Sequence, residues 1–295
     1  MTLEARRPPT TPCLGVCVFD AAVGRCIGCA RTLDEIAEWG RASDAYRESV
    51  WAELPGRAAE MGLTVRRLDW QGERLLDEVA ARFAAAEGRF AVGVHGAVAE
   101  VLRAPDEPFE TDRAASVLTV KTPRAALRVK AATYLTAFEI QRPEDAPVIA
   151  LAVPKGRAGQ RGPAELTDLG PDAESLLARD AGGRRFDLGL GRRVARFTLR
   201  CSAELSDAIA PQCGTPWPDC LERIGPAVLS ASPVRVVEAP CLRAEVDTPM
   251  SPPGTTPPEG PHTGLLPAQI AQGRSMPPNL SLPDDYVLSA LFYPS

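Results

Sequence analysis

The chain has 295 residues, of which 45% are hydrophobic and 24% are charged, and its formal net charge is −5 at pH 7. This composition is ordinary for a globular protein and excludes collagen, a coiled coil and general disorder. The acidic balance argues against nucleic acid or an anionic membrane as a partner, because both bind basic surfaces. No apolar run reaches the roughly 18 residues of a membrane span, and no secretory signal is readable. We therefore expect a cytoplasmic protein, and the length favours two domains.

Four of the eight cysteines lie close together near the N-terminus. Cys13, Cys17, Cys26 and Cys29 follow the spacing C-x3-C-x8-C-x2-C. In a reducing compartment, clustered thiols indicate metal ligands rather than disulfides. Four thiolates can close a tetrahedral zinc site or ligate an iron–sulfur cluster, and Arg25 and Arg31, which flank the second pair, would offset their negative charge. The pattern favours a metal centre over a transient dithiol pair or four unrelated thiols, and it leaves zinc and iron–sulfur open.

The residues around these cysteines predict the local fold. The sequence at 20–24 favours a tight hairpin turn between the two cysteine pairs. Thr32 and Glu35 form the T-x-x-E capping box of a helix that begins directly after the last cysteine. Ser43 is the expected cap of a second helix, which the Pro-Gly pair at 55–56 should break or kink. The cysteines are thus expected to lie at the start of a small α-rich module.

Size supports a metal in this segment. Residues 12–62 are too few to fold stably around an apolar core alone, and domains of this length usually need a metal, a disulfide or a partner surface. We expect Trp39 and Trp51 to pack over the cysteine site rather than to bind a ligand. A structural zinc supplies roughly 10–16 kcal/mol in finger peptides, which is enough to decide folding. We predict a metal-dependent module of residues 1–62.

The motif C-x3-C-x2-D-x3-G-x-C-x-G-C-x-R-T-x2-E-I-x2-W runs from Cys13 to Trp39, and W-x2-L-P follows at 51–55. It resembles the small bacterial family DUF1289, and the resemblance covers residues 12–62. Members of that family are described as predicted Fe–S proteins and have no established activity. The resemblance therefore favours an iron–sulfur cluster over zinc as the cofactor.

Residues 72–295 are expected to form a second, larger domain. A helix is predicted from residue 72, with Leu76, Val79 and Phe83 on its apolar face. Alternating apolar runs separated by turns predict antiparallel strands at 90–94, 98–102, 117–121, 126–130, 133–141, 148–153, 186–190, 195–199, 234–237, 242–246 and in 280–292. Further helices are expected at 202–210 and 218–229. Ten prolines in residues 249–283 predict an extended, loop-like segment.

Three short motifs in this second part carry another resemblance. They are GAVAE at 96–100, FDLG at 186–189 and PEGPHT at 258–263, the last followed by Leu266-Pro267. Together they resemble an alphaproteobacterial family, DUF6925, from residue 72 to the end of the chain. That family is of unknown function and implies no mechanism. Its members carry a second histidine where this chain has Gly264, so a paired-histidine site is not expected.

The remaining residues favour structural roles. No P-loop, nucleophile elbow or H-E-x-x-H helix is present. His95 is expected at a hairpin turn, and His262, which Glu259 could orient, is expected in a structural hydrogen bond. The run at 184–200 has six arginines and one aspartate, which favours a solvated strand face over an anion site. The other four cysteines are expected to be buried apolar thiols: Cys201, Cys213, Cys220 and Cys241.

The sequence thus predicts an α+β protein, with a small α-rich four-cysteine module before a larger domain that has an antiparallel sheet and flanking helices. It favours a non-enzymatic metal-binding protein with a structural or sensing role, and it assigns no catalytic residue. Two alternatives stay open, an electron-transfer or redox protein that uses the cluster and a zinc-dependent adaptor for nucleic acid or protein. A protein partner is left open, whereas a membrane or nucleic-acid partner is not expected.

Overall fold

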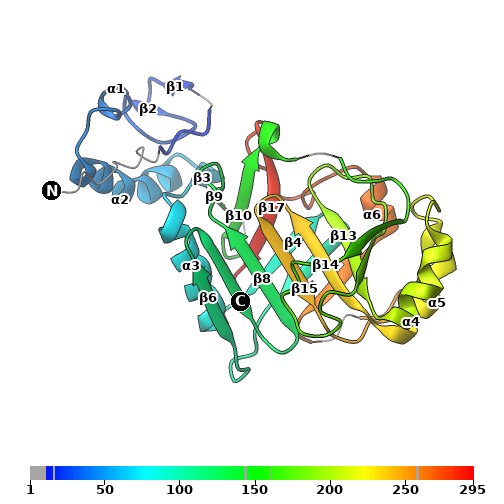
Figure 1. Ribbon diagram of the computed structural model, residues 1–295. Helices are drawn as coiled ribbons and strands as arrows, with labels where there is room; N and C mark the ends of the chain where they lie inside the picture. Colours follow the sequence, from blue (N-terminus) through cyan, green and yellow to red (C-terminus); the bar gives the residue numbers. More distant parts are fainter. Residues whose placement is uncertain (1–10, 16, 143–144, 160, 257–258) are drawn as a thin grey trace.

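The computed structural model describes residues 11–15, 17–142, 145–159, 161–256 and 259–295. Figure 1 shows a small N-terminal module, in blue, beside a larger body built mainly of strands. The predicted α+β class is confirmed. Among the described residues, no helix combines the length and the apolar character needed to cross a membrane.

The module contains one hairpin and two helices. Its elements are β1 (Phe19–Asp20), β2 (Arg25–Cys26), α1 (Leu33–Glu38) and α2 (Asp44–Glu60). The predicted capping box is confirmed, because the Thr32 hydroxyl accepts from the Glu35 N–H at 3.2 Å and the Glu35 carboxylate accepts from the Thr32 N–H at 2.9 Å. The predicted cap at Ser43 is also confirmed. The predicted break at Pro55 is wrong, since α2 continues to Glu60.

Seven strands of the described chain form an antiparallel sheet, which we call the seven-stranded sheet. In spatial order they are β16 (His262–Leu265), β5 (Ala97–Val101), β4 (Arg89–Val94), β17 (Tyr286–Tyr293), β10 (Val148–Pro154), β9 (Thr136–Ile140) and β3 (Val65–Arg67). The strand β17, from the end of the chain, lies in the middle of this sheet between β4 and β10. The prediction that the tail returns to the fold as a strand is therefore confirmed.

Eight described strands form a second antiparallel sheet, the eight-stranded sheet. In spatial order they are β11 (Thr167–Pro171), β12 (Arg184–Asp187), β13 (Arg196–Cys201), β14 (Val234–Ala239), β15 (Leu242–Val246), β8 (Ala125–Lys130), β7 (Val117–Lys121) and β6 (Glu110–Ala114). The larger domain therefore has two antiparallel sheets, where the sequence suggested one.

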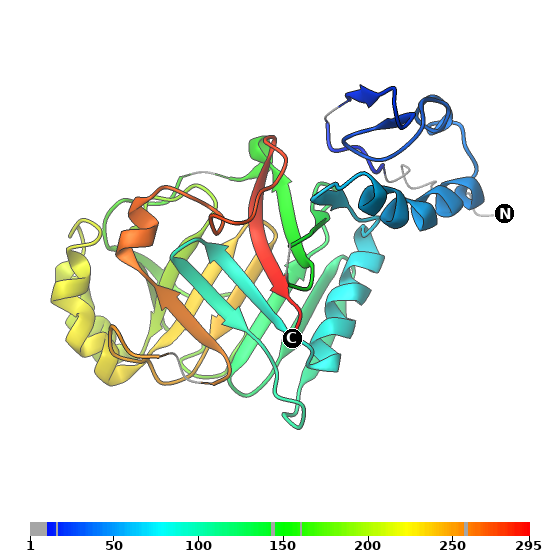
Figure 2. The same cartoon turned by 180° about the vertical axis from the view of Figure 1, so that it is seen from behind.

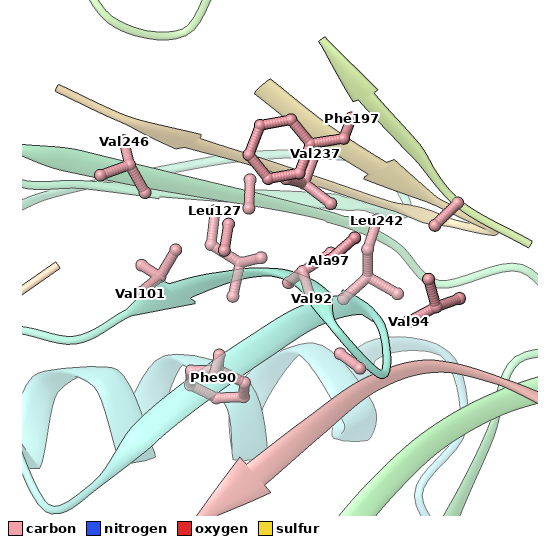
Figure 3. Close-up of a cluster of buried hydrophobic side chains, with 14 of the residues drawn as sticks. Phe90, Val92, Val94, Ala97, Val101, Leu127, Phe197, Val237, Leu242 and Val246 are labelled. Atoms are coloured by element: carbon pink, nitrogen blue, oxygen red, sulfur yellow. The ribbon is translucent and has the colours of Figure 1, made fainter. Parts of the chain in front are cut away.

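The two sheets pack face to face, and the main core lies between them. β4 and β5 of the seven-stranded sheet lie against β14 and β15 of the eight-stranded sheet. Figure 3 shows Phe90, Val92 and Val94 of β4 on the same side of the core as Ala97, facing Val237. Alternate residues of a strand point to opposite faces of its sheet, so the intervening residues of β4 point away from the core.

Helices cover the ends and one side of this double layer. They are α3 (Gly72–Ala85), α4 (Ala203–Ile209), α5 (Cys220–Ala231) and α6 (Pro267–Ala271), with short 3₁₀ turns at Lys155–Arg157 and Ala210–Gln212. α3 lies against β7, and its Leu76, Val79 and Phe83 are buried as the helical spacing predicts, together with Leu75. The helix ends at Ala86, a residue in the left-handed conformation.

Several sequence expectations for the larger domain need correction. The short strands β3, β6 and β11 were not predicted. The proline-rich segment 249–283 is not wholly loop-like, because it contains β16 and α6. The arginine-rich run is not simply a solvated face, since Arg200 is completely buried. An arginine can be enclosed in this way where oxygen acceptors surround its guanidinium.

Those partners form a buried ion network on the outer face of the eight-stranded sheet. Arg200 Nη1 lies 2.8 Å from Glu245 Oε2 and 3.1 Å from Asp172 Oδ2. Arg243 contacts the same two carboxylates. Glu245 also accepts two backbone N–H bonds, both of 3.0 Å, from the loop at 176–177. The network therefore fixes this loop onto the sheet, and every charge in it has a partner.

Candidate metal centre

The hairpin and the loop after it bring the second cysteine pair into the interior of the module. Cys26 ends β2 opposite Phe19, and its N–H donates to the Arg31 carbonyl at 2.8 Å. The chain thereby closes a tight loop over residues 26–31, in which Ala30 adopts a left-handed conformation with φ of 58°. Cys26 and Cys29 are buried, at 2% and 7% exposure. The first pair is more open, because Cys13 is half-buried and Cys17 is exposed.

Three of the four sulfur atoms accept N–H groups from their own loops. The Gly15 N–H lies 3.3 Å from Cys13 Sγ, and the Gly28 N–H lies 3.4 Å from Cys26 Sγ. Arg31 Nε lies 3.4 Å from Cys29 Sγ. Donors aimed at sulfur stabilise a thiolate over a thiol, and thiolates are the form that binds metal.

The pKa values of Cys17 and Cys29 are both affected by neighbouring cysteines. Cys13 raises the pKa of Cys17, first through its charge and then through a hydrogen bond, and Cys26 acts in the same direction. Burial raises the pKa of Cys29, which Cys26 also raises, whereas Arg31 opposes both shifts. In the part of the chain that the structure describes, no three or more His, Cys, Asp or Glu side chains are grouped closely enough to hold one metal ion. A four-thiolate centre in this segment stays a prediction.

Arg31 is the charged side chain of this site. It is only 3% exposed, and its guanidinium carbon lies 4.7 Å from the ring centroid of Trp39. No carboxylate of the described residues forms an ion pair with it; its polar contact is the sulfur of Cys29. Arg31, one of the two arginines that the sequence singles out, therefore lies beside the sulfur of Cys29. Arg25, on the other side of the pair, turns to Glu60 at 2.9 Å.

The first cysteine loop also contacts the larger domain. Leu14 packs against an apolar cluster that contains Leu280 and Leu288, on the outer face of the seven-stranded sheet. Arg67 lies on β3, the edge strand of that sheet: burial lowers its pKa, and the charges of Tyr286 and Cys13 oppose the shift. Sequence reasoning missed Arg67, because its distance from the cysteines in sequence gives no signal that it folds back beside them.

Comparisons with known proteins agree with this division of the chain. The model of a family of unknown function, DUF6925, matches residues 74–295. The chain belongs to the DUF6925 family. The model of a second family, a protein of unknown function designated DUF1289, matches residues 11–58. Both resemblances seen in the sequence are confirmed. No curated protein and no solved structure matches the chain.

The two histidines lie in the DUF6925 domain, far from the cysteine loops in sequence. His95 occupies the predicted turn between β4 and β5. His262 begins β16, where its Nδ1 lies 3.0 Å from the Gly260 carbonyl oxygen. The nearby carboxylate is Glu100 of β5, 3.8 Å from Nε2, and not Glu259 as the sequence suggested.

The other four cysteines of the DUF6925 domain do not share one environment. Cys201 and Cys220 are buried as predicted, and burial raises their pKa values to about 12 and about 11. The prediction is wrong for Cys213, which is exposed, and for Cys241, which is half-buried at the turn between β14 and β15. Turn residues cannot be covered on both sides as strand residues are, which explains the difference.

Proposed function

We propose that Cys13, Cys17, Cys26 and Cys29 hold one metal centre, an iron–sulfur cluster with zinc as the alternative, and that this centre serves a structural or sensing role for the DUF6925 domain. The observation that carries the proposal is the buried Arg31 guanidinium, whose polar contact is a cysteine sulfur. The protein would then work in the reducing cytoplasm, where these thiols stay available for metal.

The charge of Arg31 is the first step of the argument. A cation removed from water is costly unless an anion lies beside it. Neutral thiols supply no such anion, whereas a metal centre with four thiolate ligands keeps a net negative charge. Arg31 would bind and orient that charge from inside the module, and the N–H groups of Gly15 and Gly28 would stabilise the sulfur atoms from the loops.

The contacts with the larger domain are the second step. Leu14 lies one residue after Cys13, and it is packed against the seven-stranded sheet. Arg67, which is half-buried, brings a second cation from β3 to the neighbourhood of Cys13. A change of charge or geometry at the cysteines would therefore reach the sheet through two adjacent contacts. This arrangement supports a role in stabilising or reporting to the DUF6925 domain, with no catalytic residue required.

Metal analysis of the full chain, purified without oxygen, tests the proposal. We expect bound iron and sulfide with visible absorption that dithionite bleaches; a colourless protein with one zinc per chain would select the zinc alternative. Cys29→Ser should lose the metal. Cys213→Ser, which removes an exposed thiol outside the module, should retain it and is the matched control. Protein that binds neither metal, or whose metal content is unchanged by Cys29→Ser, would contradict the proposal.

The exposure of Cys17 favours electron transfer as a second candidate function. A sulfur ligand at the surface would bring the centre close to an external donor or acceptor, whereas a purely structural centre is usually enclosed. Repeated reduction and reoxidation of the wild-type protein by a flavodoxin or ferredoxin reductase system would support this role. A centre that is destroyed in the first cycle would exclude it.

A further inference from the structure

A cavity of about 230 Å³ opens on the outer face of the seven-stranded sheet, the face turned away from the eight-stranded sheet. Figure 2 shows this face from the front, with β16, β5, β4 and β17 side by side and α6 at its margin. The floor of the cavity is apolar and is formed by Ala91, Val98, Leu288 and Leu291. Leu266 and Gln269 form the wall on the side of α6.

The lining positions explain why space is left there. Gly264 of β16 faces the cavity without a side chain, and a Cβ at this position would meet only Val98 Cγ2, at 3.5 Å. At the other margin, Gly96 has φ of 86°, and a Cβ there would collide with Ile270 N at 2.8 Å. The glycine at 96 therefore lets α6 approach the sheet, while the glycine at 264 keeps the cavity open.

One end of the cavity is polar. Arg89 of β4 and Glu100 of β5 form an ion pair, with Arg89 Nε 2.8 Å from Glu100 Oε2. The Arg89 guanidinium also stacks on Tyr293 of β17, with its carbon 4.9 Å from the ring centroid. His262 of β16 lies behind Glu100, at 3.8 Å. The polar row crosses four neighbouring strands, and it brings together two motifs, GAVAE and PEGPHT, that sequence analysis singled out.

The hydrogen-bonding capacity of Arg89 is only partly used. Its Nε forms the ion pair with Glu100 and its plane stacks on Tyr293, while 45% of the side chain stays exposed to solvent. Neither Nη1 nor Nη2 has an acceptor among the described residues. An arginine that presents two parallel N–H donors matches the two oxygen atoms of a carboxylate.

We propose that this cavity binds a small monocarboxylic acid with a compact apolar body. Its carboxylate accepts from Arg89 Nη1 and Nη2, and its body lies on Ala91, Val98 and Leu291. The volume is below the roughly 300–1,000 Å³ of pockets for drug-sized ligands, so the occupant is smaller than those. This site is separate from the cysteine centre, and the inference does not depend on the proposed function.

The charges of Arg89 and Glu100 favour a ligand with a single negative charge. Arg89 is the single arginine that lines the cavity, and Glu100 lies directly beside it. Glu100 already offsets the Arg89 charge, so it repels any anion, and it repels a phosphate ester with close to two negative charges more strongly than a ligand with a single carboxylate. A cationic ligand would meet Arg89 first. An uncharged apolar ligand would gain no charged hydrogen bond from Arg89.

The test uses the full chain and 4-fluorobenzoate as the probe, with binding followed by the ¹⁹F NMR line width and shift. We expect saturable binding at millimolar probe, and clearly weaker binding of 4-fluorobenzyl alcohol, which has the same ring and no carboxylate. Arg89→Gln should weaken 4-fluorobenzoate binding by about tenfold, the loss of one charged hydrogen-bonding pair. Arg223→Gln, which changes an exposed arginine on α5, should bind as the wild type does.

A second variant keeps the test independent of the ion pair. Gly264→Val fills the cavity, and its Cβ fits without a clash, so the domain should fold with an unchanged melting temperature and lose the probe. The proposal is overturned if the wild type shows no saturable binding of 4-fluorobenzoate. It is also overturned if Gly264→Val binds normally, or if the alcohol binds as tightly as the acid.

Discussion

The N-terminal module and the DUF6925 domain differ in the size of the apolar core that stabilises each of them. The domain buries the inner faces of two sheets against each other (Figure 3). The module buries one small apolar cluster, formed by Ala30, Trp39, Val50 and Leu54. A cluster of this size cannot offset the conformational entropy of the segment by itself. The difference indicates that the module needs a further source of stability, and the cysteines are the residues able to supply it.

The two regions also differ in the partners of their buried arginines. In the domain, Arg200 meets Asp172 and Glu245, so its counter-charges belong to the protein. In the module, Arg31 is almost as deeply buried, yet it faces the sulfur of Cys29. Under the proposed function, the anion beside Arg31 would form when the thiol loses its proton on binding metal.

The largest effect should come from removing the metal centre. Cys26→Ser, or treatment of the wild type with a chelator, should abolish hydrogen-exchange protection in residues 26–60 and leave β4, β10 and β17 protected. Metal binding contributes roughly 10–16 kcal/mol in small zinc modules, far more than the apolar cluster here can supply. Exchange followed by mass spectrometry measures both regions at once. Full protection of α2 in the metal-free protein would remove the contrast between the two regions.

A smaller effect is expected in the domain, where the charges are balanced internally. Glu245→Ala leaves Arg200 and Arg243 without a shared carboxylate and removes the acceptor of the loop at 176–177. Breaking a buried ion pair from one side typically costs about 3–5 kcal/mol. Urea unfolding of the domain should show this loss, while Glu222→Ala, an exposed change on α5, should show almost none. An equal result for the two variants would mean that the network does not stabilise the domain.

The smallest expected effect concerns Asp187 on β12, where a substitution should stabilise the domain instead of destabilising it. Burial raises the pKa of this carboxyl, and the Gly189 N–H and Arg196, 3.9 Å away, only partly oppose it; Oδ2 has no hydrogen-bond donor among the described residues. A carboxyl whose pKa is raised on folding binds its proton more tightly in the folded state. Its contribution to stability therefore falls as pH rises from the ordinary value of 3.8 through the folded pKa.

Asp187→Asn should accordingly stabilise the domain at neutral pH, and the gain should disappear below about pH 3.8. Urea midpoints of the variant and the wild type across this range measure the effect, with Asp207→Asn, an exposed change on α4, as the control. A variant that is less stable than the wild type at every pH would contradict this prediction, because it would show that the charged Asp187 carboxylate stabilises the folded domain.

The parts of the fold that follow from local pattern were predictable from the sequence. The capping box at Thr32 and the apolar face of α3 depend on neighbouring residues, and the β4–β5 hairpin depends on a short turn. β3 and β6 were missed because they are short edge strands, and every residue of β6 is exposed, so neither has the alternation of a half-buried strand.

The environments of Arg200 and Arg67 were missed for a different reason. Arg200 and Arg67 look like surface residues in the sequence, since their partners lie in distant segments. Asp172 and Glu245 reach Arg200 only after the loop folds over the sheet, and Arg67 reaches Cys13 only after the module docks. The spacing of the four cysteines was readable because all four lie in one short segment, whereas long-range pairing of charges leaves no local signature.

The position of β17 has a consequence for synthesis of the protein. This strand pairs with β4 on one side and β10 on the other, and both partners are made much earlier. The seven-stranded sheet therefore cannot close until residues 286–293 have left the ribosome. The module precedes the sheet in translation order, so its thiols leave the ribosome before the surface that receives Leu14 exists.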